Sequence, residues 1–444
     1  MSGQATRVEK QAGRSLSTEE IFEITWAREK SLSRLLILYI STGLAFMLLP
    51  GTFLGMWNLL AISSHHTANS VSAGWIQAHG HAQIFGWIGT FILGIGFYSI
   101  PKLRRMNPFA LWAPWICWGL WTSGIGLRWL TGVYQLQWQV LLPLSAAFEL
   151  AAFLIFFKCV SGHRPQDSRK RGLEKWVLVV ITASVGLLAT LLVNFGAALF
   201  LAIRGASSDL PPGFDKRFLV LETWGFLVPF VWGFSAKWLP IFLGLRPIRE
   251  GGLLVAVGAN SLGVLTAMAG WMTLAVILLL SGICVSIWAL RLAEPRQQPA
   301  KTKGVHISFP IFVRSAYLWG IIAAILGIWA SAVTNSNGIW GASRHALTVG
   351  FLATMVFSIG QRILPAFSGM RLLFSAKLML FSLLLLTIGC LLRVSSEILA
   401  YQGFAGWAWS CLPVSAVTEM TAVTIFGVNL LLTFVSNPPS QEVQ

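Results

Sequence analysis

Four of the seven histidines of this chain gather in one short segment: His65, His66, His79 and His81. The last two open an apolar run, WIQAHGHAQIFGWIGTFILGIGFYSIPKL, at residues 75–103. His345 opens a second run, IWGASRHALTVGFLATMVFSIGQRILPAF, at residues 339–367. An imidazole in an apolar segment is costly without a partner, and neutral imidazole is the commonest metal ligand in proteins. The pattern therefore predicts a site that binds a metal or a metal-containing cofactor.

The two runs are copies of one another. Placing His81 on His345 aligns them without a gap, with seven identities over 21 positions, including a proline twenty residues further on. A third copy, VLETWGFLVPFVWGFSAKWLP, lies between them at residues 220–240 and carries Val220 in the histidine position. Functional sites of membrane proteins with internal repeats often lie between the repeated units.

Composition identifies the elements that carry these runs. Hydrophobic residues make up 55% of the 444 residues, charged residues 11%, and the mean hydropathy is +0.71. A soluble domain has about 25% charged residues. Apolar stretches of about 20 residues, enough to cross a bilayer core of about 30 Å, recur along the chain. These stretches are too long for transmembrane strands, and apolar and polar residues do not alternate along them. We therefore predict an all-α, polytopic membrane protein.

We predict one transmembrane domain over residues 33–436, between polar cytoplasmic tails at 1–32 and 437–444. Three four-helix units are expected within it, at about 33–160, 175–292 and 310–436. The repeated runs are the second, sixth and tenth of about twelve expected spans: 35–60, 81–100, 109–130, 138–158, 176–202, 218–240, 253–269, 271–290, 311–333, 345–365, 374–399 and 413–436.

The basic residues orient this bundle. Placing both termini in the cytoplasm puts 26 of the 32 Lys and Arg residues on the cytoplasmic side, as the positive-inside rule requires. The net charge of +16 is then explained by topology and by contact with anionic membrane lipid. Because the basic residues are scattered over short loops, no nucleic-acid partner is predicted.

The repeat places two histidines at one depth. All three repeated spans run from outside to inside, so His81 and His345 are expected near the outer surface, facing each other. Two such imidazoles can be the axial ligands of a haem iron, here haem b. Gly86 and Gly350 would then line the gap that holds the macrocycle. The alternatives are a hydrogen-bonded pair without metal, or direct copper binding.

A second metal site is conceivable in the outer loop. His79 precedes His81 by two positions and so points about 200° away on a helix. It could bind copper together with His65 or His66 through imidazole nitrogens. The alternative is a loop histidine in water, without a ligand.

Several other charged residues fall in or beside the spans. Arg344 precedes His345 at the place where a haem propionate would emerge, and its guanidinium favours carboxylates; the alternative is an anchor at the membrane interface. Arg393 and Glu397 are four residues apart and could neutralise each other. Three glutamates could belong to a proton path or simply reach water at helix ends: Glu149, Glu222 and Glu419.

The strings HGHAQIFGW…IP and RHALTVGFLATM…P resemble the NnrS family, and the twelve-span pattern resembles the wider architecture of heme-copper oxidase subunit I. The NnrS resemblance implies a bacterial inner-membrane protein with haem and copper, linked to nitric oxide and nitrosative stress. The first motif of that family usually reads His-Ala-His-Glu, whereas this chain has His79, Gly80, His81 and Ala82.

Oxidases of this architecture also need copper-ligating histidines on spans six and seven, and this chain has none there. We therefore exclude a dioxygen-reducing enzyme. The leading hypothesis is an NnrS-like protein that binds or senses nitric oxide or transfers electrons to a redox partner. The rivals are a haem-free transporter with Asn194 and Asn260 on its path, and a degenerate oxidase subunit that conducts electrons or assists assembly.

Overall fold

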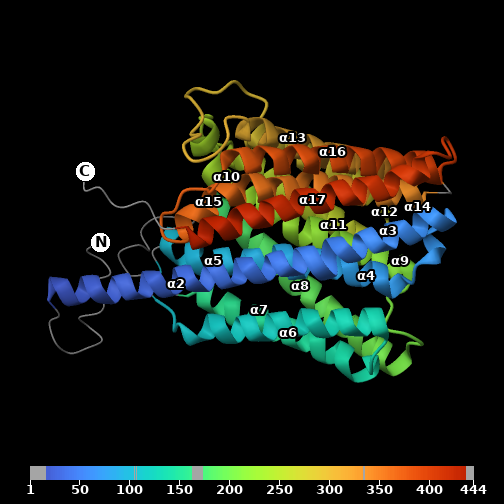
Figure 1. Ribbon diagram of the computed structural model, residues 1–444, viewed down its shortest axis with the longest axis horizontal. Helices are drawn as coiled ribbons and strands as arrows, with labels where there is room; N and C mark the ends of the chain where they lie inside the picture. Colours follow the sequence, from blue (N-terminus) through green and yellow to red (C-terminus); the bar gives the residue numbers. More distant parts are fainter. Residues whose placement is uncertain (1–16, 105, 107, 163–173, 334–335, 437–444) are drawn as a thin grey trace.

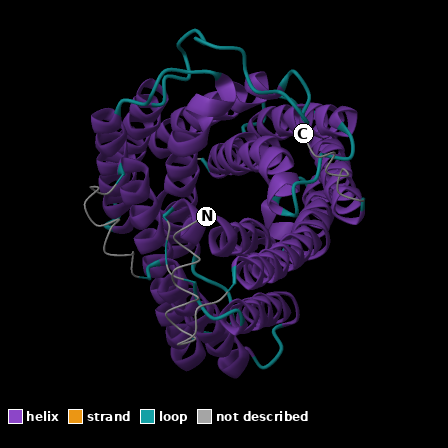
Figure 2. Cartoon of the chain, turned by 90° about the vertical axis from the view of Figure 1, so that its left-hand side faces the viewer, coloured by secondary structure: helices purple, strands orange, loops and turns teal. Residues whose placement is uncertain are grey.

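The computed structural model describes residues 17–104, 106, 108–162, 174–333 and 336–436, and this part of the chain is helical without strands. The long helices pack side by side in an elongated bundle (Figure 1) and form a ring when viewed end-on (Figure 2). Helix α2 begins and α17 ends at the same end, which we call the cytoplasmic end because of the charge distribution. The predicted all-α membrane architecture is confirmed.

Each predicted span corresponds to a helical rod in the described residues. Some rods are interrupted by π-helical segments, which are labelled η. The elements in chain order are α2 (Thr18–Phe46), η1 (Met47–Phe53), α3 (Leu54–His65), a 3-10 turn η2 (Ala68–Ser70), α4 (Ala73–His81), η3 (Ala82–Gly89), α5 (Thr90–Leu103), α6 (Trp112–Tyr134), α7 (Trp138–Val160), α8 (Lys175–Arg204), α9 (Pro212–Val220), η5 (Leu221–Leu227), α10 (Val228–Leu243), α11 (Glu250–Met268), α12 (Met272–Ala289), α13 (Phe309–Ala332), α14 (Asn337–His345), η6 (Ala346–Ala353), α15 (Thr354–Phe367), α16 (Ala376–Tyr401) and α17 (Ala408–Val435).

Eleven of these rods in the described chain are long and apolar enough to cross a membrane. The remaining predicted span, 109–130, forms the helix α6, which is rich in tryptophan and lies alongside α7 (Figure 1). Indole rings lower its mean hydropathy because each carries a polar N–H, although they suit a membrane interface. The structure thus agrees with about twelve spans.

The repeated spans share one irregularity at one position. Each changes from α-helix to π-helix directly after the histidine position of the alignment, at Ala82, Leu221 and Ala346. Segments of π-helix are rare and often occur at functional sites. Their recurrence in register supports three repeated units, including the middle copy without histidine.

The repeated spans also begin earlier than predicted. They were expected to start at residues 81, 218 and 345, but the helices begin at Ala73, Pro212 and Asn337. In the first of them, the Ser72 hydroxyl accepts a hydrogen bond from the Trp75 amide and caps the helix. The histidines therefore lie within helices rather than at their mouths.

The first span likewise extends into the predicted polar tail. Helix α2 begins at Thr18, because Ser17 and Glu20 form a reciprocal capping box. The rest of that tail, residues 1–16, and the tail 437–444 lie outside the described residues. A π segment with Pro50 inside it, η1, interrupts this long rod within the membrane.

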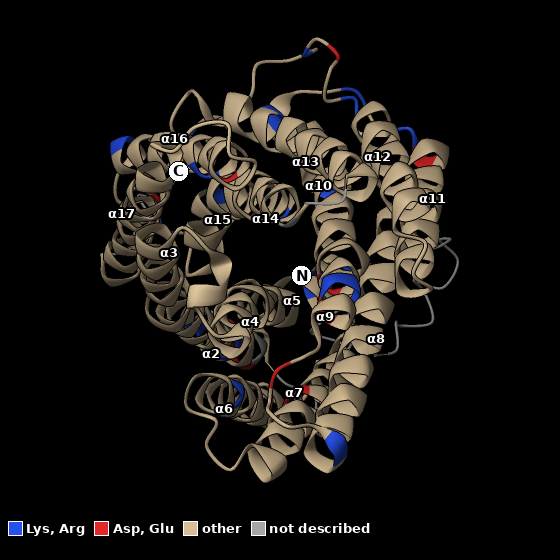
Figure 3. Cartoon of the chain, turned by 90° about the vertical axis from the view of Figure 1, so that its right-hand side faces the viewer, with Lys and Arg blue, Asp and Glu red and all other residues tan. Residues whose placement is uncertain are grey.

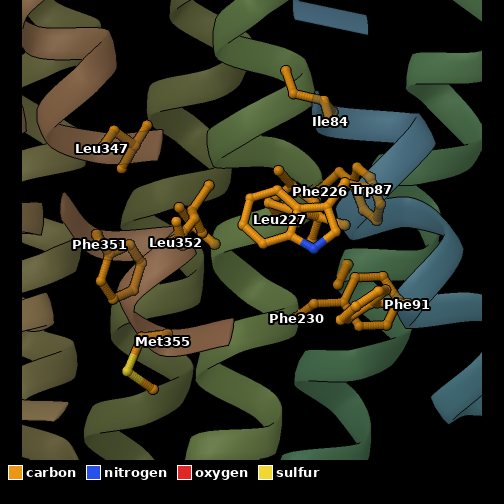
Figure 4. Close-up of a cluster of buried hydrophobic side chains, with 14 of the residues drawn as sticks. Ile84, Trp87, Phe91, Phe226, Leu227, Phe230, Leu347, Phe351, Leu352 and Met355 are labelled. Carbon is orange, nitrogen blue, oxygen red and sulfur yellow. The ribbon is translucent and has the colours of Figure 1, made fainter. Parts of the chain in front are cut away.

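The three repeated spans contribute equivalent residues to one buried core. Trp87, Phe226 and Phe351 occupy one position of the alignment, and all are buried in the same cluster (Figure 4). Phe91, Phe230 and Met355 occupy another and lie one turn further along (Figure 4). Equivalent residues of the three spans are thus buried in one core, as expected of repeated units.

One close approach of backbones gives a stability prediction. A methyl group on Gly186 of α8 would collide with the backbone carbonyl of Gly225 in η5, whereas one on Gly196 of the same helix would meet nothing within 4 Å. Gly186→Ala is therefore expected to destabilise the bundle by about 1–3 kcal/mol through overpacking. Thermal unfolding in detergent measures this, with Gly196→Ala as the matched control. Equal unfolding temperatures for the two variants would contradict the packing.

Candidate cofactor site

A cavity of about 440 Å³ lies between the three repeated spans, near the end at which α4, α9 and α14 begin. Side chains from all three π segments line it, as do His79, His81 and His345. Cofactor pockets typically have volumes of about 300–1,000 Å³. The structure thus brings the histidines of the two motifs to one cavity of suitable size.

His345 ends α14 with its ring held by two oxygen atoms. Its Nδ1 lies 2.9 Å from the Gly341 carbonyl oxygen and 3.1 Å from Oε2 of Glu397 on α16. Arg393, one turn before Glu397, places its Nε 3.6 Å from the same carboxylate oxygen. With Nδ1 protonated and engaged, Nε2 carries the free lone pair, which is the tautomer that ligates a metal.

His79 is held in the same way from the first span. Its Nδ1 lies 2.8 Å from the Gly51 carbonyl oxygen, which belongs to η1. A methyl group on Gly55 would come within 2.5 Å of the imidazole, so this glycine gives the ring its space. His79 lines the same cavity as His345 and Arg393.

His81 faces a different group of residues. Its Nε2 lies 2.8 Å from Oε1 of Glu149 on α7, a carboxylate with no exposed surface. The other carboxylate oxygen accepts a hydrogen bond from Asn194 of α8, at 3.4 Å, and the His81 ring stacks on Phe85. His79 and His81 therefore diverge, as the helical spacing predicts: the Nδ1 of His79 is held by η1, whereas the Nε2 of His81 contacts Glu149.

The two predicted glycines, Gly86 and Gly350, lie at contacts between helices. A methyl group on Gly86 would lie 3.0 Å from Cβ of Phe46 on α2, and one on Gly350 would lie 2.5 Å from Cγ of Trp319 on α13. Neither glycine lines the cavity. Each allows its repeated span to pack closely against the span before it, which small residues do in membranes.

The predicted copper ligands are not brought together. The Nδ1 atom of His65 lies 2.9 Å from the Ala61 carbonyl oxygen, and the His66 ring stacks on Trp409. His79 is directed to η1 instead. Within the described ranges, no three His, Cys, Asp or Glu side chains are grouped to hold a metal ion. A copper site at these histidines would need the outer loop to rearrange.

Charged residues surround the cavity at its outer end. Arg344 is exposed there, and Asp215 and Lys216 of α9 also line the cavity. Figure 3 views this end of the bundle and shows that charged positions are sparse on the helices. Arg344 thus lines the cavity at the rim, and its contact with an acidic group of a bound molecule stays a prediction.

The two asparagines proposed for a transport path, Asn194 and Asn260, form hydrogen bonds with neighbouring helices. Asn194 donates to Glu149, and Asn260 of α11 donates a hydrogen bond of 2.7 Å to the Trp224 carbonyl oxygen. Only Asn194 lines the cavity. Side-chain amides that are engaged with neighbouring helices stabilise helix packing.

A second internal repeat went unrecognised in the sequence-based prediction. The strings LPLSAAFE at 142–149 and LPVSAVTE at 412–419 end in Glu149 and Glu419, and GIGLR and GCLLR end in Arg128 and Arg393. By this repeat, the fourth span is similar in sequence to the twelfth, and the third to the eleventh. The similarity of these spans identifies Arg128 as the counterpart of Arg393.

The packing of the two copies is the same. A methyl group on Gly124 would lie 2.8 Å from Cγ of Glu149, and one on Gly389 would lie 2.6 Å from Cγ of Glu419. In the middle unit, Gly263 makes this contact with Leu279. The first and third units therefore keep a histidine, an arginine and a glutamate, and the middle unit has apolar residues in their place: Val220, Ala267 and Leu279.

Two buried polar atoms near His345 have no partner in the described chain: Nη1 of Arg393 and Oε1 of Glu419. Nε of Arg393 and Oε2 of Glu397 are engaged only in the ion pair with each other and, for Oε2, with His345. Buried polar atoms are almost always satisfied, so such a group calls for an explanation. A polar molecule bound in the cavity would supply the missing partners, which fits a cofactor with carboxylate groups.

Comparisons with known proteins identify the fold. A family model described as a domain of unknown function (DUF8744) matches residues 228–433, from α10 to α17. No curated protein matches the chain. A heme-copper terminal oxidase, solved as a dimer by cryo-EM, superposes with a TM-score of 0.63 and 12% sequence identity, over 92% of this chain and 84% of the oxidase chain. The chain has the fold of a heme-copper oxidase.

Proposed function

We propose that this chain is a b-type haem protein of the bacterial inner membrane that handles nitric oxide, as NnrS proteins do. The observation that carries the proposal is the pair His79 and His345, which line one cavity on opposing spans. Each is anchored through Nδ1 to a backbone carbonyl. This anchoring orients Nε2 for an iron and fixes the ring before the cofactor arrives.

The choice of His79 over His81 rests on hydrogen bonding. In the alignment of the repeated spans, His81 is equivalent to His345. The sequence therefore predicts His81 as the second ligand of a haem iron. Its Nε2 is already 2.8 Å from the fully buried Glu149 carboxylate. Taking that nitrogen for an iron would leave the carboxylate without its partner in a site of low dielectric, which is costly. We assign His81 instead to the polar network of the first unit.

The remaining residues provide for the acidic groups of a haem. Arg393 has one buried nitrogen atom, Nη1, without a partner, and Arg344 lies exposed at the outer rim. A guanidinium binds carboxylates through its forked donors, so both suit haem propionates. When bound, the haem would supply an iron for binding a diatomic gas or passing single electrons. The protein residues hold it, fix the imidazole tautomers and exclude water.

Dioxygen reduction is not part of this proposal. The chain has no histidine between His163 and His306, so spans six and seven provide none of the copper ligands that such a reaction requires. The proposed roles are therefore binding of nitric oxide, sensing of nitric oxide, or electron transfer. Copper enters only through the NnrS resemblance, and the redox partner is not specified by these residues.

The wild-type spectrum tests the proposal. Protein produced in haem-replete cells and purified in detergent is expected to show sharp b-type bands in the reduced-minus-oxidised spectrum, with about one haem per chain. Nitric oxide added to the reduced form is expected to shift the main absorption band. A colourless protein of full stability would contradict the proposal and favour a haem-free transporter.

A further inference from the structure

A second cavity, of about 100 Å³, lies on the axis of the repeated spans. All of its lining residues belong to these spans, and most come in sets of three that share a position of the alignment. The sets are Ile88, Leu227 and Leu352; Phe91, Phe230 and Met355; Ile92, Val231 and Val356; and Ile95, Phe234 and Ile359. The cavity is therefore a product of the threefold repeat.

Its lining is almost entirely apolar. The one hydroxyl among the lining residues, on Ser235, accepts a hydrogen bond from Tyr317 at 2.8 Å. A buried water molecule needs two to four polar partners, whereas an apolar cavity of this order stays dry and takes up small apolar molecules such as xenon. Charged or strongly polar molecules would lose their hydration here without compensation.

The small cavity adjoins the larger one. Ile88 and Leu227 line both of them, so these two side chains lie at the boundary between the apolar space and the histidine-lined space. Side-chain rotations occur on fast timescales, and a molecule of two atoms needs little room. A small apolar molecule in the inner cavity is thus one side-chain layer away from the candidate cofactor.

We propose that the axial cavity binds small, uncharged, apolar molecules and delivers them to the histidine-lined cavity. The class includes diatomic gases, which dissolve in the bilayer core. That nitric oxide is the gas concerned rests on the proposed function, whereas occupancy of the cavity by an apolar gas does not. No bond is made or broken in this step.

Xenon tests the binding site directly. Crystals of the wild-type protein under xenon pressure are expected to show xenon on the axis between Ile92, Val231 and Val356. Val231→Phe should abolish this density by filling the space, and Val356→Phe serves if the first variant folds poorly. Val255→Phe on α11, whose side chain is 61% exposed, is the matched control and should keep the density. Absence of xenon from the wild-type cavity overturns the proposal, whether or not haem is bound.

The kinetics of nitric oxide rebinding test whether the axial cavity delivers gas to the histidine-lined cavity. After photolysis of the nitric oxide complex of the reduced protein, Val231→Phe should lose the fast phase of rebinding that wild type and Val255→Phe retain. Unchanged kinetics would overturn the delivery role even if xenon binds. A colourless wild-type protein would instead defeat the proposed function and leave the xenon result standing.

Discussion

His345→Gln is expected to abolish the haem spectrum of the purified protein, and His79→Gln is expected to do the same. Each substitution removes an imidazole whose Nδ1 contacts a backbone carbonyl oxygen and whose Nε2 is the proposed ligand of a haem iron. A glutamine amide cannot replace an imidazole as an axial ligand. The measurement is the reduced-minus-oxidised spectrum, together with haem content per chain.

His81→Gln is the matched control, because it removes an imidazole two residues from His79. Glutamine can still donate a hydrogen bond to Glu149, so the buried carboxylate keeps a partner and the fold is preserved. We expect haem content and band positions like those of the wild type. The reverse result, with bands lost in His81→Gln and kept in His79→Gln, would restore His81 as the ligand.

The fold was largely predictable because the bilayer limits the choice of structure. A membrane-spanning chain satisfies its backbone polar groups internally, so long apolar runs must be helices. The starts of the repeated spans were not predictable from hydropathy. Residues 73–80 are less apolar than the run that follows, and they are helical because Ser72 caps the helix and the bundle extends beyond the apolar layer.

The candidate site was predictable in its residue types but not in its pairing. The repeat identified His81 and His345 as equivalents, and the structure places both on one cavity. Which neighbour each ring meets depends on how the helix is rotated. Hydropathy does not reveal this rotation in a membrane bundle, because lipid-facing and protein-facing surfaces are both apolar. The carbonyl of Gly51, which holds His79, lies in a π segment that no sequence pattern indicated.

Polar residues on spans three, four, eleven and twelve also carry information about the site. Similar strings on spans four and twelve, and on spans three and eleven, show that the first and third units share a glutamate and an arginine as well as a histidine. The two units then diverge: His81 pairs with Glu149, whereas His345 pairs with Glu397, whose counterpart in the first unit is Gly132. This divergence is consistent with a cofactor ligand in the third unit and a closed polar network in the first.

Glu397→Gln is expected to raise the midpoint potential of the haem and to weaken its retention. The Glu397 carboxylate lies 3.1 Å from Nδ1 of His345 and makes that imidazole a stronger electron donor. A negative charge at this position stabilises the oxidised iron, which carries one more positive charge than the reduced iron. The neutral amide also leaves Arg393 without its counter-charge, which favours the reduced state further.

Replacing a group that orients a metal ligand typically weakens binding by about 10- to 100-fold. A tenfold loss confined to the oxidised form corresponds to a rise of about 59 mV for one electron. Spectroelectrochemical titration measures the potential, and transfer of haem to an apoprotein acceptor measures retention. Glu149→Gln, which alters the carboxylate beside His81, is the matched control and should leave the potential close to that of wild type. A larger rise in Glu149→Gln than in Glu397→Gln would show that the iron is bound on the His81 side, because the potential responds most to the carboxylate that contacts the ligating imidazole.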